Sequence, residues 1–361
     1  MKRSRIIFLQ SIVCALICLS TWPCQAQETR PVASPSPTPR SAEQPEETIR
    51  IFSEEVYLPI FAYDDNGRFD PTLEMDDILV LEDGVPQQVR SVQRVPASIL
   101  LLLCTSGEVN PAMRTNMTLD VSRNLVSNLR AGDRIAIMQF TSRTELIQDW
   151  TTDTPLIEKA LASKVHSGRG TRLAPAITAA AAELQKQPAG NRHLVIIGDG
   201  VDVPPWANYS ELMKAFSPDE EQSAGVALAQ AIRDLIATEA TVYVISYHAL
   251  AQQIMEGKQK RRSSYGAGPP VSDGMRFDPA MRRLQKAYEK AMQKSEDRLT
   301  SLVEETGGRL LLPTSSEEMI AEGSAAARDI GSQYVVTYTP KRPLAAAPKA
   351  EYRHLTVASR R

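Results

Sequence analysis

The stretch ILLLLCTSGE, residues 99–108, decides the fold. Five apolar residues in succession are typical of a strand that is buried on both faces, as in a parallel sheet. Cys104, Ser106 and Glu108 follow this run directly. A buried parallel strand delivers the residues that follow it to the carboxyl edge of its sheet, where ligands bind in folds of this type. We therefore expect a candidate site that contains a thiol, a hydroxyl and a carboxylate.

The chain around this strand alternates between short apolar strands and helices. Further strands are predicted at 134–140, 144–150, 193–199, 241–247 and 309–313, and helices at 110–129, 154–163, 174–186, 219–237, 279–305 and 316–331. Such alternation predicts an α/β, doubly wound domain with a mostly parallel sheet, here over residues 97–332. Residues 250–278 are polar and rich in Gly and Pro, which indicates a flexible insertion. We interpret the basic run Lys258–Arg262 inside it as a solvated loop face.

Residues 49–96 follow a different pattern, with apolar residues at alternate positions that predict strands. Turn signals occur at Asp65–Gly67 and at Asp83-Gly84. We predict a small β module of three or four strands, which is too small to be stable without packing on something else. Two more alternating strands occur in residues 333–361, after the α/β domain. We expect them to fold back and complete the module.

The first 26 residues resemble a secretory signal peptide. Three basic residues precede an apolar run over 6–19, and small residues lead to a predicted cleavage site after Ala26. An uncleaved membrane anchor is the alternative, because the apolar run approaches the length that spans a bilayer. We expect a secreted or periplasmic protein. Residues 27–48 consist largely of Pro, Ser, Thr and Glu, which predicts a disordered linker.

The composition excludes some functions. The 361 residues are 42% apolar, which suffices for a large core. Lys and Arg number 41 against 43 Asp and Glu, a net charge of −2 that argues against nucleic-acid binding and against binding to a membrane surface. Three of the four cysteines lie in the signal segment, so the exported chain keeps Cys104 alone and forms no internal disulfide.

Three segments are expected at the carboxyl edge of the sheet: Cys104–Glu108, the SGRGTRL loop, and the GDG sequence after a strand. At these residues the chain resembles the von Willebrand factor type A family. Members of that family carry a metal-ion-dependent adhesion site with the pattern Asp-x-Ser-x-Ser, a distant Thr and a distant Asp before Gly. Ser106, Thr171 and Asp199 match the first serine, the threonine and the last aspartate. EDGVPQQV, VEETGGRLL and SQYVVTYTP are similar to segments of exported bacterial proteins with this domain.

Two departures make the predicted site degenerate. Cys104 stands where the pattern has its first aspartate, and Glu108 where it has its second serine. Mg²⁺ and Mn²⁺ prefer oxygen ligands, and a thiol suits softer metals. The resemblance then implies a rearranged oxygen set for Mg²⁺ or Mn²⁺: Ser106, Glu108, Thr171 and Asp199. The alternative is a vestigial site, in which Glu108 favours the start of the next helix and the other two residues stabilise their own loops.

The resemblance implies a protein-binding module that uses the strand-end face, with a protein or a cell-surface polymer as ligand. Trp206, Tyr209 and Arg169 are expected on the rim of this face. A second interpretation is a metal-independent structural or scaffolding protein of the cell envelope.

A third interpretation is a thiol enzyme that uses Cys104 with His166 as its base. No Gly-x-Ser-x-Gly elbow, His-Glu-x-x-His motif or phosphate-binding loop occurs in the sequence. We therefore predict that the protein is not an enzyme.

Overall fold

Strand β5 (Ser98–Cys104) lies inside a six-stranded sheet in the computed structural model, and all seven of its residues are buried. It pairs in parallel with β6 (Arg134–Phe140) on one side and with β8 (Arg192–Ile197) on the other. The sheet has the order β10-β9-β8-β5-β6-β7, completed by β9 (Thr241–Ile245), β10 (Arg309–Leu311) and β7 (Thr144–Thr151). Only β7 pairs antiparallel in this sheet. The prediction of a mostly parallel sheet is confirmed.

The structure describes residues 55–64, 69–106, 111–203, 205, 208–250, 279–343 and 353–361. The predicted signal peptide, the linker 27–48, the turn at Asp65–Gly67 and the insertion beyond Leu250 with its basic run lie outside these ranges. All described residues belong to one unit, Phe52–Arg361. No helix among them is long and apolar enough to cross a membrane.

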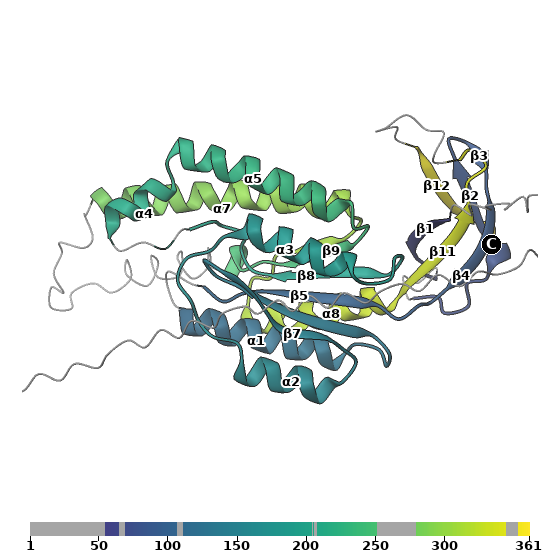
Figure 1. The fold of residues 1–361 in the computed structure, drawn as a ribbon, viewed down its shortest axis with the longest axis horizontal. Coiled ribbons are helices and arrows are strands. Elements are labelled where there is room, and N and C mark those ends of the chain that lie inside the picture. The colour runs from purple at the N-terminus through teal and green to yellow at the C-terminus, as the bar shows by residue number, and fades with distance from the viewer. Residues whose placement is uncertain are drawn as a thin grey trace, which may run out of the picture. The chain divides into compact units, whose positions relative to one another are not determined.

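Helices cover both faces of the six-stranded sheet (Figure 1). One face packs against α1 (Pro111–Ser127), α2 (Thr154–Ser163) and α8 (Ser316–Gly331), and the other against α3 (Leu173–Gln185), α5 (Pro218–Ile236) and α7 (Pro279–Glu305). Along β5, residues 99, 101 and 103 enter the first core, whereas residues 100, 102 and 104 enter the second. A strand buried on both faces has no solvent-facing position, which explains its continuous apolar run.

A short helix, α4 (Tyr209–Ala215), occurs where no helix was predicted. Asn208 caps it by accepting a hydrogen bond from the Glu211 N–H at 3.0 Å, and its own amide lies 3.3 Å from the Glu211 carboxylate. The sequence signal was an Asn followed three residues later by a Glu. Leu212 of this helix packs with Met292 of α7 in a small core beyond the strand ends.

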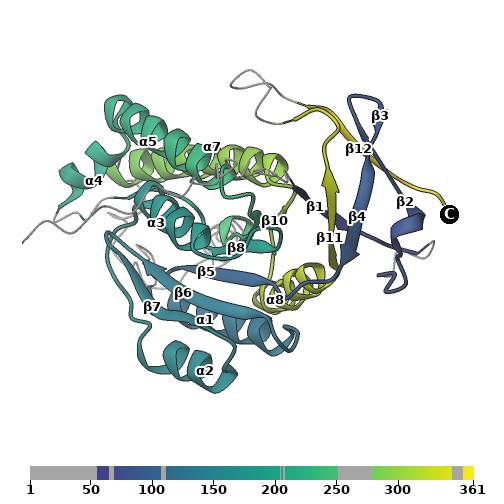
Figure 2. The ribbon, with the colours of Figure 1, turned by 45° about the vertical axis from the view of Figure 1, so that its right-hand side comes forward.

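The C-terminal strands complete the N-terminal β module, as predicted (Figure 2). One small sheet has the order β1-β11-β4, with β11 (Gln333–Thr339) between β1 (Val56–Phe61) and β4 (Gln88–Gln93). The other has the order β12-β2-β3 and contains β12 (Leu355–Ser359), β2 (Ile78–Glu82) and β3 (Val85–Pro86). The two sheets share one apolar core, which includes Val80 of β2 and Val336 of β11. A one-turn helix, η1 (Met75–Asp77), precedes β2.

A buried ion pair ties the end of the chain to this module. Glu82 at the end of β2 is 4% exposed and pairs with Arg353, which also donates hydrogen bonds to the carbonyls of Arg342 and Pro343. The Tyr338 hydroxyl of β11 donates to the other Glu82 oxygen at 3.3 Å. Burial and the nearby Glu82 carboxylate raise the pKa of Tyr338 to about 12, so this hydroxyl stays a donor.

We predict that Arg353→Ala lowers the free energy of unfolding by about 3 kcal/mol, because it leaves the Glu82 carboxylate buried without its cation. Arg342→Ala is the matched control. It removes an exposed pair with Asp83, with atoms 3.0 Å apart, and should cost less than about 1 kcal/mol. Urea denaturation measures both values, and equal losses in the two variants would contradict the assignment.

Candidate functional site

The candidate site lies where the strand order of the six-stranded sheet reverses. The chain proceeds from β5 to β6 and β7 on one side, and then returns to β8 on the other side of β5. Loops that leave β5 and β8 at their carboxyl ends therefore diverge, which opens a crevice in doubly wound folds. Cys104 ends β5, and Asp199 lies two residues beyond the end of β8.

A third segment, residues 168–171, lies between these two strand ends. The Gly168 N–H donates to the Thr105 carbonyl at 3.1 Å, and Ser106 and Gly168 form a parallel β-bridge. Thr171 forms an antiparallel bridge with Val203, and its N–H donates to the Val203 carbonyl at 2.6 Å. Backbone hydrogen bonds thus join the loop to the segments after β5 and after β8.

Cys104, at the end of β5, and Gly198, directly after β8, lie in close contact. A Cβ added to Gly198 would lie only 2.7 Å from the Cys104 Cβ, so only glycine fits there without a shift of the backbone. Cys104 is 1% exposed, and its Sγ lies 3.5 Å from the Ser106 Oγ. The three segments therefore surround one point at the sheet edge.

Thr171 and Asp199 both hold the loop 199–203. The Thr171 hydroxyl donates to the Val201 carbonyl at 2.6 Å and accepts from the Val203 N–H at 2.9 Å. One Asp199 carboxylate oxygen accepts from the Val201 N–H at 3.2 Å, and the other accepts from the Tyr288 hydroxyl at 3.3 Å. These contacts agree with the alternative in which both side chains stabilise their own loops.

Asp202 is a residue that the sequence analysis did not select. One of its carboxylate oxygens accepts from the Leu173 N–H at the start of α3, at 2.5 Å. Burial raises the pKa of Asp202, and the hydrogen bond from Leu173 and the guanidinium of Arg298 partly offset this rise. The sequence shows Asp202 as a second aspartate three residues after Asp199. Its hydrogen-bond partner could not be predicted, because the first turn of α3 lies about thirty residues earlier in the chain.

The structure places the predicted site residues as follows. Ser106, Thr171 and Asp199 are 3%, 6% and 5% exposed, and each lies in one of the three converging segments. Arg169 is exposed on the loop between them. Glu108 and Trp206 lie outside the described residues, as does the side chain of Tyr209.

Residues 99–201 match the profile of a family described as the von Willebrand factor type A domain. Over these residues the chain is similar to the von Willebrand factor type A domain. This match covers β6, β7 and β8, all of β5 except Ser98, and the segments of the candidate site as far as Val201. No curated protein matches the sequence.

Solved structures show weak similarity to the chain. A von Willebrand factor type A protein from Catenulispora acidiphila is 11% identical over 78% of this chain and 50% of its own, with a TM-score of 0.41. The PilB minor pilin from Streptococcus sanguinis is 12% identical over 66% and 63%, with a TM-score of 0.42. An aerotolerance-related membrane protein from Bacteroides fragilis is 15% identical over 65% and 98%, with a TM-score of 0.38. The chain therefore spans about half the length of the first of these structures.

The donors that the structure describes at the three segments, with a thiol where a second carboxylate would be needed, do not fit a hard divalent cation. Asp199 is the one carboxylate among the predicted ligands inside the described ranges, and both of its oxygens accept hydrogen bonds. The Thr171 hydroxyl is engaged twice, and Cys104 offers a soft thiol. No group of three His, Cys, Asp or Glu residues able to hold a metal occurs in the described part of the chain. The set that includes Glu108 stays a prediction.

The burial of Cys104 argues against a nucleophilic thiol. Its side chain belongs to the core between the sheet and α3, α5 and α7. His166 lies on an exposed loop, where it bonds to Gln139 at 3.1 Å and to the Lys164 carbonyl at 3.2 Å. Nucleophilic catalysis needs an accessible thiolate within reach of its base. The Cys104 Cβ packs against Gly198, and the sulfur lies 3.5 Å from the Ser106 hydroxyl.

We predict that Gly198→Ala destabilises the domain by about 1–3 kcal/mol, because its new methyl group overlaps the Cys104 Cβ. Combination with Cys104→Gly should remove most of this loss, whereas combination with Cys104→Ala, which keeps the Cβ, should not. Denaturant unfolding of the single and double variants measures the coupling. Equal losses in both backgrounds would show that strands β5 and β8 do not approach each other as described.

Proposed function

We propose that the protein is an exported interaction module whose partner binds at the carboxyl edge of the six-stranded sheet. The observation that supports this proposal is the convergence of residues 104–106, 168–171 and 198–203 on one point of that edge. The match to the type A domain agrees with it, because the resemblance implies adhesion through this face. The N-terminal segment 1–26 supports export.

The bonding within these loops suits a recognition surface. Their backbones are tied to one another by hydrogen bonds that do not involve a ligand. A surface ordered in advance loses little conformational entropy on binding, so more of the contact energy appears as affinity. Arg169 is exposed on the central loop and supplies a guanidinium that can pair with a carboxylate of the partner.

We further propose that the partner contacts this face directly, without a bridging Mg²⁺ or Mn²⁺. The support is the chemistry of the donors: position 104 carries a thiol, Thr171 is bonded to Val201 and Val203, and Asp199 is bonded to Val201 and to Tyr288 of α7. Glu108 is the residue that would restore a second carboxylate. Calorimetry on this residue's variants therefore decides between direct and metal-bridged contact.

A photo-crosslinking amino acid at position 169 tests the interaction surface. We expect a discrete crosslinked product with a protein of the host cell envelope, because this side chain is exposed on the central loop. The control places the same group at Lys186, an exposed residue at the end of α3 away from its first turn. No product at 169, or the same product at both positions, would contradict the proposal and favour a scaffolding role.

Titration calorimetry with MgCl₂ and MnCl₂ tests the metal. The wild-type protein should show no binding tighter than about 1 mM. The double variant Cys104→Asp/Glu108→Ser restores the family pattern, and it should bind either ion and gain thermal stability from it. Tight binding by the wild type that Glu108→Gln and Asp199→Ala abolish would establish the metal-bridged form instead.

A further inference from the structure

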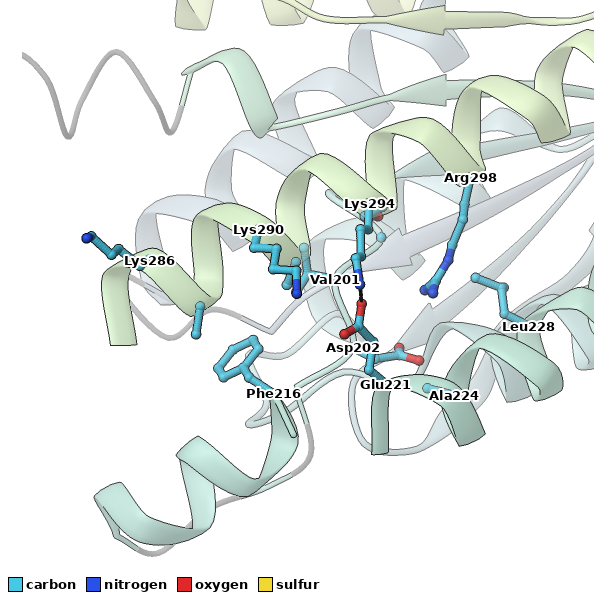
Figure 3. A pocket seen from close by; sticks show the side chains of 14 residues that line it. Val201, Asp202, Phe216, Glu221, Ala224, Leu228, Lys286, Lys290, Lys294 and Arg298 are labelled. Atoms are coloured by element: carbon cyan, nitrogen blue, oxygen red, sulfur yellow. Dashed lines mark hydrogen bonds and ion pairs between the residues drawn. The ribbon is translucent and has the colours of Figure 1, made fainter. Parts of the chain in front are cut away.

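A groove between α5 and α7 lies beside the strand-end loops. One pocket of about 350 Å³ opens there and is lined in part by Gly200, Val201 and Asp202 (Figure 3). A second pocket of about 580 Å³ continues along the same two helices. The two pockets share Glu221, Lys290, Lys294 and Arg298, so they adjoin each other, and we refer to them together as the groove.

Four cations occupy one line along α7, at residues 286, 290, 294 and 298, and all four line the groove. Two carboxylates line it, Asp202 and Glu221, so the lining carries two positive charges in excess. Glu221 pairs with Lys294. A Cβ at Gly225 of α5 would lie 3.2 Å from Arg298, which shows that this guanidinium reaches across to α5. Lys290 is exposed and has no ion pair within the described ranges.

The spacing of these cations matches an extended peptide. Residues four apart on a helix are separated by about 6 Å along its axis. Alternate residues of an extended strand are separated by about 6.7 Å and point to the same side. Lys290, Lys294 and Arg298 can therefore face three successive alternate side chains of one strand. A single phosphate group would need donors that converge on one point.

The wall opposite the cations is largely apolar. Ala224 and Leu228 line it from α5 in the first pocket, and Glu221 is the charged residue of α5 beside them. Phe216 closes the outer end near Lys290 (Figure 3). In an extended segment, side chains between the alternate positions point the other way, toward this wall.

We propose that the groove binds an extended segment of a partner protein that alternates acidic and apolar residues. Its carboxylates face the cations of α7, and its apolar side chains face α5. The carboxylate nearest Lys294 displaces Glu221 from that lysine. Gly200–Asp202 border both this groove and the strand-end loops, but the cations that face the segment lie on α7, so the proposal does not require binding at Arg169 and the central loop.

A fluorescein-labelled peptide, Gly-Glu-Leu-Glu-Leu-Glu, tests the proposal by fluorescence anisotropy with the full chain. We expect binding that weakens with salt. Lys290→Glu should weaken it about fivefold or more, because it reverses a charge with no carboxylate partner among the described residues. Glu221→Gln should tighten it, because Lys294 then loses its competing internal partner. Arg283→Glu, on the same helix but outside both pockets, is the charge-matched control and should change nothing.

Two further probes make the result decisive. Replacing the three Glu of the peptide with Gln should abolish binding, and replacing the two Leu with Ser should weaken it. No binding by the wild type below about 1 mM, equal binding of the Gln peptide, or equal effects of Lys290→Glu and Arg283→Glu would each overturn the proposal. Circular dichroism confirms that each variant is folded. Crosslinking at position 169 is a separate experiment. A negative result at one surface therefore does not affect the test of the other.

Discussion

The hydrogen bonds that join the loop 168–171 to its two neighbours are the constraint on which the site depends. Gly168 is bonded to the end of β5, and Thr171 is bonded through both its backbone and its hydroxyl to the segment after β8. A buried strand such as β5 can hold its own end in place. The loop has no strand or helix of its own over these residues. Without these bonds, its residues would be a solvated connection rather than part of a surface.

Other hydrogen bonds connect the three converging segments to the groove between α5 and α7. Asp199 bonds to Tyr288, and its carbonyl accepts a hydrogen bond from Ser295, both on α7. Ser295 also lines the groove. The loop after β8 therefore contacts both surfaces. Binding of a partner at one surface can change the structure of the other through this loop. An effect of the acidic peptide on crosslinking at position 169 would be a coupling free energy between two sites in the usual thermodynamic sense.

The sequence predicted the fold well, because periodicity reports burial. An apolar run such as residues 99–103 fits few structures other than a buried strand, and the predicted helices and strands around it begin and end within one or two residues of the observed ones in most cases. The helix α4 was missed because the prolines and Trp206 before it suggested a loop. The convergence of the three segments was predicted from topology. The bonding partners of Thr171, Asp199 and Asp202 were not, because they depend on how loops far apart in the chain pack. The cation row on α7 has a four-residue period, but the sequence alone does not show which helix it faces.

Amide hydrogen exchange at Gly168, Thr171 and Val203 tests the central claim most directly. Each of these N–H groups donates within the joined segments, to the Thr105 carbonyl, the Val203 carbonyl and the Thr171 hydroxyl. The account predicts exchange at least about a hundredfold slower than in an unstructured peptide, since exchange requires the segments to separate. Exchange of all three at the rate of an open loop would contradict the convergence from which the site was built.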